Sequence, residues 1–202
     1  MSETTAAPHL YWDRYVGPDH RWRTDPLTKR ELKPPGEELA AMRAGLGRPA
    51  MDHPKLWPHY TSPVDDFLAM RDEVSVEQHA EHAALTLFGL HQQSQNTPMH
   101  RQGIKLGKAL LALRQNGKFS EDAVDRRVAT LAGVTSVPAL LVHLRGLITQ
   151  LRTIGQPLDY THLMADILAW HTVEQRSAVR RRWALGYQAW KTEPGDAKKN
   201  PA

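Results

Sequence analysis

The fold class of this 202-residue chain is decided by residues 137–153, VPALLVHLRGLITQLRT. The apolar residues of this stretch recur at intervals of three and four, so they share one face of a helix. They are Leu140, Leu141, Leu144, Leu147, Ile148 and Leu151. Gly155 and Pro157 follow directly and end the pattern. The sequence therefore predicts an amphipathic helix over about 137–153 with a buried leucine face.

The same periodicity recurs elsewhere, and no segment alternates apolar and polar residues with the period of a strand. It predicts helices over 38–46, 76–93 and 99–114, a helix that starts at Ser120, one that carries Leu163 to Trp170, and a last one that carries Val179, Trp183, Tyr187 and Trp190. We therefore expect an all-α protein, a helical bundle of two closely packed lobes.

Breaks in composition suggest how the chain is organised. Six glycines and prolines lie within residues 17–36, which favours loops. We expect a loop-rich N-terminal extension over 1–36, an N-terminal helical lobe over 37–97, a basic C-terminal helical lobe over 98–192 and a disordered tail over 193–202.

Composition excludes several classes of protein. The chain has no cysteine, which removes disulfide frameworks, thiolate zinc sites and cysteine nucleophiles and fits a reducing compartment. No apolar run is long enough to span a bilayer, and residues 1–7 lack the order of a signal peptide. We expect a cytoplasmic protein without membrane contact.

Charge is distributed unevenly along the chain. Residues 98–193 carry 14 Lys and Arg against 7 Asp and Glu, a balance of +7, whereas residues 1–97 carry 10 against 14, a balance of −4. Any single cation is more often part of a solvated helix face than of a binding site. The collective bias nevertheless favours a polyanion, such as nucleic acid, as the partner of the second half.

The predicted helix over 99–114 concentrates this charge. Arg101, Lys105 and Lys108 stand at i, i+4 and i+7 and would form a cationic line along one face. Gly103 and Gly107 superficially resemble a phosphate-binding loop, but the spacing is one residue short and no strand precedes them. We expect them to let a neighbouring helix approach closely.

Further cations mark the later helices. Arg126 and Arg127 are adjacent, and Arg145 and Arg152 stand one heptad apart at the margin of the leucine face, where guanidinium groups can reach a phosphate backbone. In the last helix we expect Arg181 and Arg182 to be exposed, and Arg176 to be an internal ion-pair partner.

Nothing in the sequence predicts catalysis, a metal or a cofactor. His79 and His82 stand at i, i+3, but no third ligand is tied to them by a known spacing. The carboxylate pairs at 65–66 and 72–73 are explained by helix capping. A nucleophile elbow is missing. The sequence therefore argues against an enzyme.

The order of the motifs resembles the CasB family, the small subunits of the type I-E CRISPR surveillance complex Cascade. The resemblance rests on residues 39–48 (LAAMRAGLGR), 56–60 (LWPHY), 87–91 (LFGLH), 103–110 (GIKLGKAL), 125–127 (DRR), 143–147 (HLRGL) and 158–160 (LDY). It covers about residues 37–190.

This resemblance implies a helical protein of two lobes without catalytic residues. It implies two copies in each complex, with the backbone subunits, the large subunit, guide RNA and target DNA as partners. The family's basic surface holds the target strand and the displaced strand of DNA. Arg43, Lys108, Arg126, Arg127 and Arg145 match basic positions of the family.

Three further candidates, Arg101, Lys105 and Arg152, come from helix geometry alone. Residues 1–36 depart from the family by their length and proline content. The resemblance therefore assigns no role to the cations of this segment, Arg21, Arg23, Lys29 and Arg30.

Two other classes of function stay open at this stage. A DNA-binding regulator would need a short turn and a recognition helix with base-facing residues, and no turn has that form clearly. A helical adaptor would place the basic face against an acidic protein. Nuclease treatment separates the adaptor from a nucleic-acid binder, because a protein contact survives it.

Overall fold

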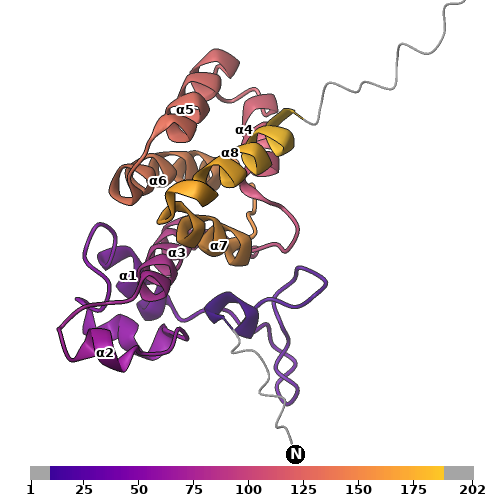
Figure 1. Cartoon of the computed structure of the whole chain (residues 1–202). Coiled ribbons are helices and arrows are strands. Elements are labelled where there is room, and N and C mark those ends of the chain that lie inside the picture. Colours follow the sequence, from indigo (N-terminus) through magenta and orange to yellow (C-terminus); the bar gives the residue numbers. More distant parts are fainter. Residues whose placement is uncertain (1–9, 189–202) are drawn as a thin grey trace, which may run out of the picture.

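The computed structural model describes residues 10–188, and Figure 1 shows them as packed helices. The elements are η1 (Tyr11–Arg14), α1 (Gly36–Ala44), η2 (Pro54–His59), α2 (Asp66–Ala69), α3 (Val76–Gln92), α4 (Leu106–Gln115), α5 (Glu121–Gly133), α6 (Val137–Thr153), α7 (Tyr160–Trp170) and α8 (Val173–Gln188), where η marks a 3-10 helix. Extended pairing within residues 10–188 is limited to three isolated bridges. The predicted all-α fold class is confirmed.

Helix α3 is the centre of the bundle and packs against α1, α6 and α7. It begins at a capping box, in which the Ser75 side chain accepts from the Gln78 backbone and the Gln78 side chain accepts from the Ser75 backbone. From Ala80 to Gln92 every residue is buried. A helix that is buried all round holds the surrounding helices in place.

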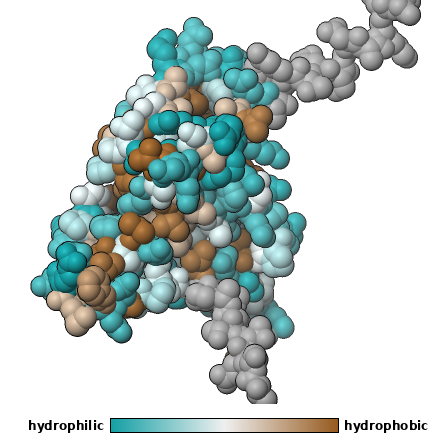
Figure 2. Space-filling model, viewed as in Figure 1, coloured by the Kyte–Doolittle hydropathy of each residue, from teal (hydrophilic) through white to brown (hydrophobic). Residues whose placement is uncertain are grey.

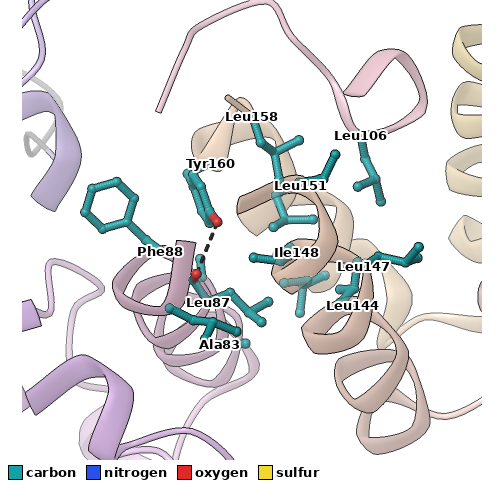
Figure 3. Packing of buried hydrophobic residues seen from close by; sticks show 14 of the residues in the cluster. Ala83, Leu87, Phe88, Leu106, Leu144, Leu147, Ile148, Leu151, Leu158 and Tyr160 are labelled. Carbon is teal, nitrogen blue, oxygen red and sulfur yellow. Dashed lines mark hydrogen bonds between the residues drawn. The ribbon is translucent and has the colours of Figure 1, made fainter. Parts of the chain in front are cut away.

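The contact between α3 and α6 forms the middle of the core. Figure 3 shows Ala83 and Leu87 of α3 near the row of Leu144, Leu147, Ile148 and Leu151 on α6. Tyr160, at the start of α7, is fully buried there and donates from its hydroxyl to the Leu87 carbonyl oxygen at 3.2 Å. The leucine face predicted for residues 137–153 is therefore the one that packs, and the predicted ends of that helix are confirmed.

Two glycines allow close helix crossings. A Cβ on Gly89 would lie 2.4 Å from the Met42 Cβ of α1, and a Cβ on Gly107 would lie 2.3 Å from the Trp183 carbonyl oxygen of α8. The packing role predicted for Gly107 is confirmed. Gly103 has no neighbour within 4 Å of such a Cβ and has a φ of +84°, so it serves a turn and not a helix crossing.

The helix predicted over 99–114 is wrong in its first half, because α4 begins only at Leu106. The preceding segment is held by contacts with residues far away in the sequence. The Arg101 backbone N–H donates to the Leu158 carbonyl oxygen at 3.0 Å, and the Gly103 N–H donates to Asp159 Oδ2 at 2.8 Å. These bonds and the turn at Gly103 replace the helical ones, so Arg101, Lys105 and Lys108 do not form one line along a helix.

The N-terminal segment is anchored in the core by aromatic residues. Tyr11 and Trp12 are buried, and the Trp12 indole N–H donates to Thr161 Oγ1 at 2.8 Å. The Tyr11 and Tyr15 hydroxyls both donate to Glu38 Oε2 at the start of α1. One cluster of buried residues contains members of both predicted lobes. The division between residues 97 and 98 stays a prediction, and Trp190 and the predicted disordered tail lie outside the described residues.

Candidate nucleic-acid interface

Several cations of the C-terminal half are bonded within the fold. Arg114 of α4 reaches Glu121 at 2.7 Å and Asp125 at 2.9 Å and so ties α4 to α5. The Tyr187 hydroxyl of α8 donates to the same Asp125 carboxylate. This hydrogen bond, with that from Arg114, holds the pKa of Asp125 below its ordinary value. Arg114 therefore serves the packing of α4, α5 and α8.

Three of the four arginines of α8 are also bonded within the fold. Arg180 donates to the Val134 carbonyl oxygen at 3.0 Å, and Arg182 pairs with the buried Asp166 at 2.5 Å. Arg176 donates to the Trp170 carbonyl oxygen at 2.6 Å and has no ion pair among residues 10–188, so the predicted ion pair is wrong for the described part of the chain. Arg181 is exposed, as predicted, and so is Arg182, whose side chain is 41% exposed despite its ion pair.

Two of the predicted site residues bond to the C-terminal end of α3. Arg152 donates to the Leu90 carbonyl oxygen at 3.3 Å and to Gln93 Oε1 at 2.6 Å. The half-buried Arg43 approaches the Gly89 carbonyl oxygen at 3.5 Å. Cations at this end also offset the negative end of the helix dipole. Both guanidinium groups therefore contribute to the packing of α1, α3 and α6.

The remaining six predicted site residues have exposed side chains, and within residues 10–188 none of these side chains makes a hydrogen bond or ion pair. They are Arg101 and Lys105 in the connection before α4, Lys108 on α4, Arg126 and Arg127 on α5, and Arg145 on α6. Each therefore presents a full positive charge to solvent. Three separate helices and a loop supply the charge, in place of the single helix face that the sequence predicted.

Helix α5 shows why the local sequence exposes its arginines. Val124 and Leu131 are buried and Val128 is partly buried, which fixes one side of the helix against α4 and α6. Arg126 and Arg127 lie outside that stripe and are exposed. Figure 1 shows α5 at the periphery of the bundle, where solvent reaches its outer side.

Arg145 lies at the edge of an apolar groove of about 480 Å³ between α3, α6 and the loop after α1. Leu141 and Val142 of α6 line the groove, and Val142 is 69% exposed. Arg48 lines it on the other side. Figure 2 shows hydrophobic residues gathered at mid-height on the viewed face, whereas hydrophilic residues cover much of its top and right side.

The sequence pattern did not select every free cation. Arg48, Lys118 and Arg181 are also exposed, and no hydrogen bond or ion pair of their side chains occurs among the described residues. Arg181 was marked by its place in a run of three arginines. The sequence around Arg48 indicates the end of a helix but no binding site. Arg48 and Arg145 line the same groove only because the tertiary fold brings them together.

Of the two histidines considered as metal ligands, His82 is already hydrogen-bonded within the fold. Tyr60 donates from its hydroxyl to His82 Nδ1 at 2.6 Å, and His82 Nε2 donates to the Gly45 carbonyl oxygen at 3.1 Å. His79 is exposed. Among residues 10–188 no group of three or more His, Cys, Asp or Glu could hold a metal ion. Across the same residues, no helix is both long and apolar enough to cross a membrane.

The fold and these charges define a small helical-bundle protein with unpaired cations spread over its C-terminal half. The family model for CRISPR-associated protein Cse2 matches residues 38–187. The chain therefore belongs to the Cse2 family, and the resemblance to CasB, the Cascade small subunit, is confirmed.

Solved structures agree with this assignment. CasB from Thermobifida fusca is 27% identical with a TM-score of 0.59, and the match covers 75% of this chain and 84% of that one. TTHB189, a Cse2-family protein from Thermus thermophilus, is 25% identical with a TM-score of 0.56, over 75% and 85% of the two chains. No curated protein sequence matches the chain.

Proposed function

We propose that this protein is a non-catalytic small subunit of a CRISPR RNA-guided surveillance complex that holds DNA strands during antiviral defence. It binds nucleic acid without sequence preference and stabilises the target strand and the displaced strand of an R-loop. Its partners are the backbone and large subunits, a second copy of itself, guide RNA and target DNA, in the cytoplasm.

The observation that carries this proposal is the separation of the cations into two groups. Arg114 and Arg182 are paired with carboxylates of the fold, whereas Lys108, Arg126 and Arg127 are exposed and have no side-chain partner within residues 10–188. An unpaired exposed cation adds little to stability. Several of them in a CRISPR-associated family point to an anionic ligand of the complex, which is nucleic acid.

The mechanism is electrostatic positioning. Arg and Lys side chains that contact phosphates supply affinity and register, and guide RNA supplies the sequence through base pairing. Exchange of a DNA duplex for an RNA–DNA duplex is nearly balanced in free energy, so added contacts to the strand backbones favour the open state. No base-reading side chain is required.

The test is fluorescence anisotropy of labelled single-stranded DNA, duplex DNA and RNA with the full chain across a series of salt concentrations. With five to eight phosphate contacts, the logarithm of the affinity for a single strand should fall with the logarithm of salt with a slope of roughly −0.7 per contact. An Arg126→Glu/Arg127→Glu variant should lose most of the binding. A flat salt response in the wild-type chain would contradict the proposal.

A second charge reversal of equal size serves as the control. Lys55→Glu/Arg71→Glu changes two exposed cations of the N-terminal half. Arg71 pairs with the exposed Glu73 and lies over the exposed Phe67 ring, and both are surface contacts of small stabilising effect. Equal loss of binding in both double variants would show a dependence on net charge alone and would contradict a defined surface.

The apolar groove beside Arg145 supports the part of the proposal that concerns protein partners. Exposed apolar residues bordered by polar ones are typical of protein contacts. A Val142→Ser variant makes the groove more polar without adding a charge beside Arg145, so it should weaken incorporation into the assembled complex and leave strand binding by the free chain unchanged. Co-purification of the subunits after nuclease treatment measures the first quantity, and anisotropy measures the second.

A further inference from the structure

A second groove includes Arg101 of the surface assigned above and extends it to the N-terminal segment, because it lies between that segment and the connection from α3 to α4. We call residues 16–31 the N-terminal hairpin, because bridges join Val16 to Trp22 and Thr24 to Glu31. The groove measures about 570 Å³ and is lined by Arg21 and Glu31 of this hairpin and by Arg101 of the connection. Figure 1 shows both segments on the same side of the molecule.

Both walls of this groove are held in place by buried polar contacts. On the hairpin side, the buried Trp22 donates from its indole to the Asn96 carbonyl oxygen at 2.8 Å. On the other side, the buried Gln92 side chain donates to the Thr97 carbonyl oxygen at 2.9 Å and accepts from the Met99 N–H at 2.8 Å. The groove is therefore part of the folded protein and does not depend on a ligand to form.

The charge of the hairpin differs from that of its surroundings. Residues 16–31 carry 4 Lys and Arg against 3 Asp and Glu, a balance of +1, whereas residues 32–97 carry 5 against 9, a balance of −4. The basic hairpin thus interrupts an acidic half of the chain and lies beside the basic connection before α4.

Two carboxylates of the hairpin already have hydrogen-bond or ion-pair partners within the fold. Asp25 accepts hydrogen bonds from the Leu27 and Thr28 backbone N–H groups, and Glu31 pairs with Lys33 at 2.8 Å. Arg21 and Arg101, in contrast, are exposed and have no side-chain hydrogen bond or ion pair within residues 10–188. The groove therefore presents two unpaired guanidinium groups from segments 80 positions apart in the sequence.

We propose that this groove binds the sugar–phosphate backbone of a single nucleic-acid strand, with Arg21 and Arg101 contacting phosphates. Guanidinium groups suit phosphate oxygens because their planar donors can make paired hydrogen bonds. Free cations continue on both sides along the chain, at Lys29 and Arg30 and at Lys105, which favours an extended polyanion over a small anion. The inference rests on the proposed function and extends it to residues before position 38, where the family match begins.

The test compares Arg21→Ala, Arg101→Ala and the double variant with the wild-type full chain, with labelled single-stranded DNA as the probe. Loss of one phosphate contact should reduce the salt slope by about 0.7, which amounts to about fivefold in affinity between 1 M and 0.1 M salt. The double variant should lose about 1.4 in slope. Lys55→Ala removes an exposed, unpaired cation elsewhere and should leave the slope unchanged.

The variants at Arg126 and Arg127 separate this inference from the function on which it rests. If they weaken binding while Arg21→Ala and Arg101→Ala do not, the groove assignment is wrong and the proposed function stands. If the wild-type chain binds no strand at low salt, both are wrong. If a glutamate-rich peptide binds with the same dependence on Arg21 and Arg101, the ligand of the groove is an acidic protein and the assignment to nucleic acid is wrong.

Discussion

Helices α3 and α5 both carry polar residues but use them in opposite ways. On α3, Glu81, His82 and Gln92 are buried and bonded to neighbouring segments. On α5, only Val124 and Leu131 are buried, and Arg126 and Arg127 are exposed without a side-chain partner in the described part of the chain, residues 10–188. The comparison indicates that polar residues of α3 maintain the fold, whereas the arginines of α5 are available to a ligand. Mutations on the two helices should therefore separate stability from binding.

The largest expected effect comes from the same substitution on the two helices. Gly89→Ala on α3 places a Cβ 2.4 Å from the Met42 Cβ and 3.2 Å from the Leu39 carbonyl oxygen, so α1 must move. We expect a loss of about 3 kcal/mol in the free energy of unfolding. Gly133→Ala on α5 meets nothing within 4 Å and should stabilise by about 0.5 kcal/mol. Urea unfolding measures both, and equal effects would contradict the comparison.

The next effect concerns the buried Glu81 carboxylate. Its Oε1 accepts from the Thr61 N–H and hydroxyl, and its Oε2 accepts from the Ser62 N–H at 2.8 Å. Glu81→Gln keeps the shape but converts one acceptor into a donor, so one bond of this set becomes a contact between two donors. We expect a loss of about 2 kcal/mol, measured by urea unfolding. Glu121→Gln at the exposed start of α5 is the matched control, and a loss as large there would contradict the contrast.

A dependence of stability on pH should come from the buried histidines beside α7. Burial lowers the pKa of His91, on α3, to about 3 and that of His100 to about 4, against an ordinary value of 6.5. Between these values the unfolded chain binds protons that the folded chain does not, so stability is highest above pH 6.5 and falls as the pH decreases. Each histidine should contribute about 1.4 kcal/mol per pH unit over this window.

This prediction is checked by urea unfolding at pH 7.5, 6 and 5. A His100→Asn variant should reduce the dependence on pH, because an amide oxygen can still accept from the Tyr160 N–H that now bonds to His100 Nδ1. An unchanged slope in this variant would show that His100 is not responsible. Helix α5 has no histidine, so its stability should not change over the same window for this reason.

The parts of the fold that the sequence predicted are those with local causes. Helices α3 and α6 were found because the apolar spacing that defines them lies within each segment, and the caps at Ser75 and Ser136 are also local. The segment before α4 was mispredicted because its helical spacing is overridden by bonds to Leu158 and Asp159, more than 50 positions away. Nothing in the local pattern carries that information.

The candidate site was predicted in part for the same reason. Arg152 and Arg126 look alike in the sequence, since each is a basic residue beside an apolar helix face. They differ because the Leu90 carbonyl oxygen at the end of α3 accepts a hydrogen bond from Arg152, whereas no acceptor among residues 10–188 bonds to the Arg126 side chain. The charge asymmetry located the basic half, but only the tertiary structure distinguishes packing arginines from free ones.

The smallest expected effect on stability is at Arg126 and Arg127. It is the strongest test of the difference between α3, which maintains the fold, and α5, which is available to a ligand. An Arg126→Ala/Arg127→Ala variant removes two exposed cations that have no partner among residues 10–188, so its free energy of unfolding should stay within about 0.5 kcal/mol of wild type. Arg114→Ala also removes a cation but breaks the bonds to Glu121 and Asp125, so it should lower the melting temperature. Strand binding measured beside thermal melting then distinguishes two causes. Weakened binding at unchanged stability assigns a contact to α5, whereas weakened binding only when stability falls would mean that these arginines act through the fold.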